Sequence, residues 1–143
     1  MTPETLFSVC NMLAAAAWLA VLLLPRWPAL KAGIRFGAVG VLCAVYACLV
    51  FTSFFAVEGG GFSSLAAVKR LFASDPVLLA GWIHYLAFDL FVGVWLAERL
   101  DQLKVSRIVQ APILMTTFMF GPVGLLIGLA PGLVTPSTQP AAA

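Results

Sequence analysis

Charged side chains are scarce in this chain of 143 residues, which is 62% hydrophobic and 10% charged. A soluble domain has roughly 25% charged residues, so the composition excludes an ordinary soluble fold. The net charge of +2 is spread over loops and gives no basic surface for nucleic acid. We therefore predict an integral membrane protein whose surroundings are lipid and which has no nucleic-acid partner.

Metal-binding patterns are also missing from the sequence. Its three cysteines, Cys10, Cys43 and Cys48, lie inside apolar runs and form no CxxC pair. Cysteines in such runs are usually small buried hydrophobic residues. The sequence contains one histidine, His84. We expect no metal site and no cofactor.

No segment alternates between polar and apolar residues as a barrel strand would. Four apolar runs are each long enough to cross a bilayer, which takes about 20 residues per helix. The fold class predicted is therefore all-α, a polytopic four-transmembrane-helix bundle in one domain. The expected spans are residues 5–24, 36–57, 76–97 and 109–130, and residues 131–143 are expected to form a flexible tail.

The segment between the second and third runs, FSSLAAVKRLFAS, has two interpretations. Its apolar residues could share one side of a short amphipathic surface helix, with Lys69 and Arg70 at the membrane interface. The alternative is an ordinary connecting loop.

Basic residues predict how the chain is oriented. Six of them lie in the first and third loops, at positions 26–35 and 99–107, and two lie in the middle loop. The positive-inside rule then places the first and third loops in the cytoplasm and both termini outside. The first run has its positive charge after it, unlike a signal peptide. No transit-type sequence precedes it, which favours a bacterial inner membrane, with periplasmic termini, or a chain whose leader was removed.

The third run contains the chain's most unusual polar residues. Asp89 lies deep in the run, where a charged carboxylate costs at least about 2.5–3.5 kcal/mol. It must face the bundle interior, and it is a candidate acid or base. At about 100° per residue, Trp82, Tyr85 and Asp89 share one stripe, whereas His84 lies about 140° from Asp89. The alternative is that His84 and Asp89 only hold helices together through hydrogen bonds.

The fourth run contains Gly121 and Pro122, which predict a kink in a continuous helix. Thr117 is a nearby hydroxyl, and Asn11 is the one deep amide of the first run. The aromatic residues near these positions are core or lipid contacts, or else they surround a ligand. The candidate ligand contacts are Asn11, Trp82, Phe88, Phe91, Thr117, Phe120 and Pro122.

Two strings carry a family resemblance: WIHYLAFDLFVGVW in the third run and TTFMFGPVGLL in the fourth. Their pattern, W-x-H-x-x-x-x-D-L-F followed by F-x-P-x-G, resembles the abscisic-acid-deficient, neoxanthin-synthesis-like family of four-helix membrane proteins. The resemblance is full over about residues 76–130. In the first half it rests mainly on hydropathy and on the spacing of the spans.

The resemblance implies carotenoid chemistry. Plant members are required to convert an epoxy-xanthophyll, violaxanthin, into the allenic neoxanthin, an isomerisation without net redox change. The resemblance therefore implies acid–base catalysis by His84 and Asp89, with Tyr85 as a third donor. A bacterial member is expected to act on another carotenoid or isoprenoid.

Two other functions stay open at the level of sequence. The chain could be a non-catalytic carotenoid- or lipid-binding helper of another membrane enzyme, which its small size favours. It could also be a transporter subunit, although no inverted repeat of broken helices is visible. The pairs Gly33/Gly37 and Gly124/Gly128 could support a homo-oligomer.

Overall fold

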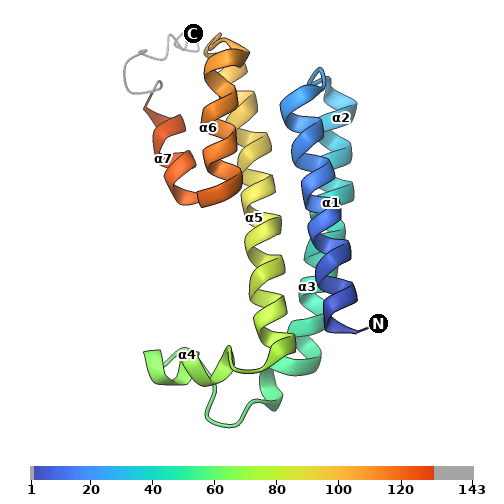
Figure 1. Ribbon diagram of the computed structural model, residues 1–143, viewed down its shortest axis with the longest axis vertical. Coiled ribbons are helices and arrows are strands. Elements are labelled where there is room, and N and C mark those ends of the chain that lie inside the picture. Colours follow the sequence, from blue (N-terminus) through green and yellow to red (C-terminus); the bar gives the residue numbers. More distant parts are fainter. Residues whose placement is uncertain (1, 131–143) are drawn as a thin grey trace, which may run out of the picture. The chain divides into compact units, whose positions relative to one another are not determined.

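The computed structural model describes residues 2–130, and these residues form helices and no strands (Figure 1). The all-α prediction is confirmed. The chain divides into two compact units, Met1–Phe91 and Val92–Ala143, and helix α5 continues from the first into the second. Each unit is described by itself, and the single domain stays a prediction. The predicted tail, 131–143, lies outside the described residues.

Helix α1, Pro3–Leu23, corresponds to the first predicted span. The Thr2 side chain caps it by accepting a hydrogen bond from the Thr5 amide at 3.2 Å, and Pro3 occupies the first turn, where its missing N–H costs nothing. The helix ends at Leu23, and the cap residue Leu24 is extended before Pro25. Its buried face consists of Cys10, Ala14, Ala17, Trp18 and Val21.

The second predicted span is part of a longer helix, Pro28–Ala56, which packs beside α1 (Figure 1). It begins as α2, Pro28–Ala32, widens into a π-helical segment, Gly33–Val39, and continues as α3, Gly40–Ser53. A short 3-10 turn, Phe54–Ala56, ends it. The π-helical segment had no counterpart in the sequence-based prediction.

The connection after this helix contains α4, Leu65–Leu71, so the helical interpretation of this segment is confirmed. Its first turn is capped by the Ser64 hydroxyl, which accepts from the Ala67 amide at 3.2 Å. Leu71 is buried, whereas Lys69 and Arg70 are exposed. The segment therefore has one apolar face and one charged face.

Helix α5, Asp75–Gln102, contains the third predicted span. With Pro3–Leu23 and Pro28–Ala56, it is one of three helices in residues 2–130 that are long and apolar enough to cross a membrane. Four spanning helices are therefore not confirmed.

The fourth predicted span is not one continuous helix. It divides into α6, Arg107–Phe120, and α7, Pro122–Leu129, which folds back along α6 (Figure 1). The break is at Gly121, whose backbone angles of φ 33° and ψ −90° end the helix. A residue with a side chain rarely adopts a positive φ, so glycine permits this turn. Pro122 then starts α7 at the position where proline fits best.

Small residues let the two arms of this α6–α7 hairpin approach closely. A Cβ atom on Gly124 would collide with the backbone and hydroxyl of Thr117. Thr117 is completely buried, and its hydroxyl donates to the Ile113 carbonyl at 2.9 Å. Gly128 packs against Leu96 of α5 within the same unit, where an added Cβ would lie 2.6 Å from the leucine side chain. Gly124 and Gly128 therefore serve contacts within the chain.

We predict that Gly124→Ala destabilises the hairpin by about 1–3 kcal/mol, the usual cost of overpacking a core. The obstacle is backbone, which cannot rotate away as a side chain could. Gly37→Ala is the matched control, because nothing lies within 4 Å of its added Cβ. Thermal unfolding of both variants in detergent checks this. Equal midpoints for the two variants would show that α6 and α7 do not approach as described.

Candidate functional site

One stripe of α5 contains Trp82, Tyr85 and Asp89, and this stripe contacts α1 at Trp82. The Trp82 indole Nε1 donates to the Asn11 Oδ1 at 3.1 Å, and the Asn11 amide nitrogen donates to the Phe7 carbonyl at 2.7 Å. The Phe7 and Trp82 rings lie 5.9 Å apart between centroids. The structure thus brings Asn11 and Trp82, both predicted ligand contacts, together from two helices.

The same stripe continues from Trp82 to Asp89 through Tyr85. The Trp82 and Tyr85 rings are 5.3 Å apart, and the Tyr85 hydroxyl donates a hydrogen bond to the Asp89 carboxylate. Oδ2 of that carboxylate is buried and has no hydrogen-bond partner within residues 2–130. A buried acceptor without a donor is costly, so this atom is suited to a donor that residues 2–130 do not supply.

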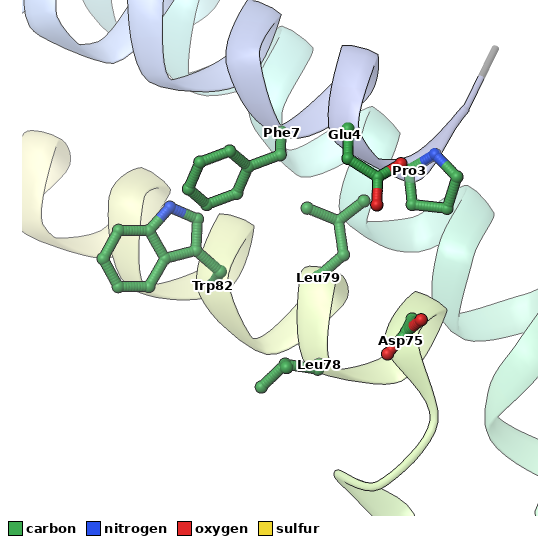
Figure 2. Close-up of a pocket in the computed structure, with 7 residues that line it drawn as sticks. All are labelled: Pro3, Glu4, Phe7, Asp75, Leu78, Leu79 and Trp82. Carbon is green, nitrogen blue, oxygen red and sulfur yellow. The ribbon is translucent and has the colours of Figure 1, made fainter.

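A cavity of about 350 Å³ lies at the start of this stripe (Figure 2). Figure 2 shows Phe7 of α1 and Trp82 of α5 at one end of it and Leu79 between the two helices. Glu4 and Asp75, each in the first turn of its helix, lie at the other end. The cavity is therefore apolar inside, with two carboxylates at one end and the Trp82–Asn11 hydrogen bond close to the other.

His84 lies on a different side of α5. Its ring stacks on Phe88 at 4.4 Å and faces Tyr46 of α3 at 5.4 Å. His84 and Tyr46 also line a second cavity, of about 290 Å³, together with Phe54, Phe62 and Phe72. This cavity is aromatic and has two polar groups, a combination typical of small-molecule sites.

His84 and Asp89 therefore do not form a pair. His84 contacts Tyr46 and Phe88, whereas Asp89 contacts Tyr85, which stacks on Trp82. The 140° separation expected from helical periodicity explains why they have different neighbours. Asp89 and Tyr85 are one candidate acid–base group, and His84 belongs to another environment.

The remaining predicted residues are distributed over both units. Phe91 lies beneath the Arg35 guanidinium, 6.0 Å from the ring centroid. Phe88 stacks on His84. Thr117, Phe120 and Pro122 belong to the second unit, where Thr117 is buried under Gly124 and the other two are exposed. The structure brings Trp82, Tyr85, Asp89 and Asn11 together. The role of Thr117, Phe120 and Pro122 as ligand contacts stays a prediction.

Two contacts were missed by the sequence analysis. Tyr46 is the partner of His84, and a phenol inside an apolar run was a signal that could have been used. Gln110 is buried, and its amide donates to the Asp101 carboxylate and to the Val105 carbonyl, each at 2.8 Å. Gln110 thereby fixes the turn between α5 and α6.

Within residues 2–130, no group of three acidic, histidine or cysteine side chains could hold a metal ion.

A comparison with protein families bears directly on these residues. The profile of ABA DEFICIENT 4-like proteins matches residues 5–127, which includes all predicted site residues. The chain belongs to the ABA DEFICIENT 4-like family. The resemblance seen in the two motifs is thereby confirmed. Comparisons with curated proteins and with solved structures found no match.

In this ABA DEFICIENT 4-like protein, the contacts of His84 are contacts between rings. We predict that His84→Phe keeps the stability of the protein, because phenylalanine preserves both ring contacts. His84→Ala loses them and costs about 0.5–1.5 kcal/mol per aromatic pair. Thermal unfolding in detergent measures the difference, with Phe51→Ala as a control at a position that is 79% exposed. If His84→Phe is as unstable as His84→Ala, a hydrogen bond of the imidazole holds the helices together.

Proposed function

We propose that this protein is an isomerase that acts on an oxygenated carotenoid or a related isoprenoid. The observation that carries the proposal is the Asp89 carboxylate, which accepts from Tyr85 and has a buried oxygen without a partner in the described residues. Ionisable residues inside membrane segments usually have a function. Membership of the ABA DEFICIENT 4-like family supports the substrate class.

The reaction needs one base and one acid and no redox partner. In converting an epoxide to an allene, a base removes a proton from the polyene, and the C–H electron pair forms the new double bond. The C–O bond breaks, and its oxygen takes up a proton to become a hydroxyl. Asp89 would accept the first proton, and Tyr85 would donate the second. Transfer from Asp89 to Tyr85 along their hydrogen bond restores both groups.

The two cavities suit a long apolar substrate with oxygenated ends. The 350 Å³ cavity ends at Trp82, on the same stripe of α5 as Asp89. The 290 Å³ cavity presents His84 and Tyr46 among aromatic side chains. Tyrosine and histidine bind a hydroxyl by hydrogen bonding, and aromatic faces bind a conjugated chain. We assign His84 to substrate binding.

A second function is supported by the separation of His84 from Asp89. A protein with two polar positions in different environments could hold a carotenoid without converting it and deliver it to another membrane enzyme. The aromatic lining of the His84 cavity is sufficient for such binding. This helper function predicts bound pigment and no conversion.

We predict that Asp89→Asn abolishes conversion and leaves folding and pigment binding intact. Asparagine has nearly the same shape and still accepts from Tyr85, but it cannot remove a proton. The protein and the variant are purified from a host that makes carotenoids. Absorption spectra then report bound pigment, and mass spectrometry of the organic extracts compares bound and free carotenoids.

Glu58→Gln is the control, because this carboxylate is exposed in the loop before α4. A bound pigment that is unchanged in both the wild type and Asp89→Asn would support the helper function. A colourless wild-type protein with only bulk phospholipid would contradict both functions. Loss of Asp89→Asn from the membrane would make Asp89 a residue that holds helices together.

The apolar helices are compatible with insertion into a membrane. We propose a bacterial inner membrane with the N-terminus in the periplasm, which the basic residues favour.

Helix α6 has 14 residues, about 21 Å, and is too short for a hydrocarbon core of about 30 Å. The hairpin would therefore enter and leave on one side. Ala130 would then lie on the cytoplasmic side, whereas the basic residues alone predict a periplasmic C-terminus.

We predict that Ala130→Cys is labelled by a membrane-impermeant maleimide only after the cells are permeabilised. The background lacks the three native cysteines. Lys104→Cys should behave in the same way, since both positions would face the cytoplasm. Ser63→Cys should react in intact cells. Labelling of Ala130→Cys in intact cells would mean that α6 and α7 together cross the membrane and that both termini are outside.

A further inference from the structure

A third cavity in the first unit differs from the other two because it has a cation. It has a volume of about 400 Å³ and lies between the helix Pro28–Ala56 and α5. Its apolar lining includes Gly40, Cys43, Phe88 and Phe91, and Arg35 is its one charged residue. Neither the acid–base pair nor the His84 cavity makes use of Arg35.

Local structure holds the guanidinium at this cavity. Arg35 is half-buried, its Nε atom is buried, and its guanidinium lies over the Phe91 ring. It also lies within the π-helical segment Gly33–Val39. Such segments are rare and are frequent at functional sites. A guanidinium is planar and always charged and has five donors, which suits it to the recognition of a phosphate.

The depth of Arg35 matches that of a lipid headgroup. The helix begins at Pro28, so Arg35 lies about 10 Å from its start. The whole helix of 29 residues exceeds the thickness of the hydrocarbon core by about 13 Å. Its first turns would therefore lie in the interfacial region, on the predicted cytoplasmic side, where the leaflet contains anionic lipids.

We propose that this groove binds one anionic glycerophospholipid of the surrounding bilayer. Arg35 binds the phosphate, and an acyl chain lies along Gly40, Cys43 and Phe88. Gly40 has no atom within 4 Å of the position of a Cβ, so the groove has room at this point. Because Phe88 also stacks on His84, which lines the proposed substrate cavity, the bound acyl chain would contact a neighbour of that cavity's wall.

Native mass spectrometry of the delipidated protein tests this site, with phosphatidylglycerol, phosphatidylcholine and farnesyl phosphate as probes. We expect phosphatidylglycerol to bind with one-to-one stoichiometry and more tightly than the other two. Arg35→Gln should weaken it about tenfold, the loss expected when a charge-assisted hydrogen bond is removed. Gly40→Leu should weaken it as well, because the added side chain fills the groove without removing charge.

Lys31→Gln is the matched control, because it removes the same charge one turn earlier, outside the groove. Its binding should stay within about twofold of wild type. Equal losses in Arg35→Gln and Lys31→Gln would mean general attraction to a basic surface and would overturn the proposal. Binding of phosphatidylcholine as tight as that of phosphatidylglycerol would also overturn it. Tighter binding of farnesyl phosphate would overturn it too, because the occupant would then be an isoprenoid phosphate. None of these outcomes depends on catalysis by Asp89.

Discussion

Three helices in residues 2–130 are long and apolar enough to cross a membrane. In hydrocarbon such helices gain little by burying one more leucine, because lipid tails are as apolar as leucine. What holds them together is close packing at small residues and a few polar contacts. In this protein the close packing is at Gly124, which lies against the backbone of Thr117. The polar contacts include the hydrogen bonds of Trp82 to Asn11 and of Gln110 to Asp101.

This constraint also explains how a carboxylate is tolerated in α5. Asp89 shares a stripe with Tyr85 and Trp82, and the stripe is anchored to α1 through Asn11. The anchor fixes the rotation of α5 about its axis in the first unit. It therefore also helps to determine that His84 faces Tyr46 of α3. The two motif residues are separated because they lie about 140° apart around one helix, and the Trp82–Asn11 hydrogen bond helps to set which neighbours each of them meets.

The sequence predicted the helical class, the family, and the end of α1 before Pro25, because hydropathy, motifs and proline are local signals. It could not predict the α6–α7 hairpin, since the run 109–130 has the length of a span whether it is straight or folded. The deciding fact is the positive φ of Gly121, and the pair Gly121-Pro122 permits a kink as well as a turn. Likewise, periodicity separated His84 from Asp89, but it could not identify Tyr46 or Asn11 as their neighbours, because those contacts join different helices.

The π-helical segment has a consequence for the whole second helix. A π turn closes its hydrogen bond over one residue more than an α turn. One extra residue in a turn offsets the parts before and after it by roughly 100° of rotation. The angle between Arg35 and Tyr46 around the helix axis thus differs from the angle that a regular α-helix would give. A relative lacking one residue between Gly33 and Val39 would carry its arginine on another face, even if every other residue were identical.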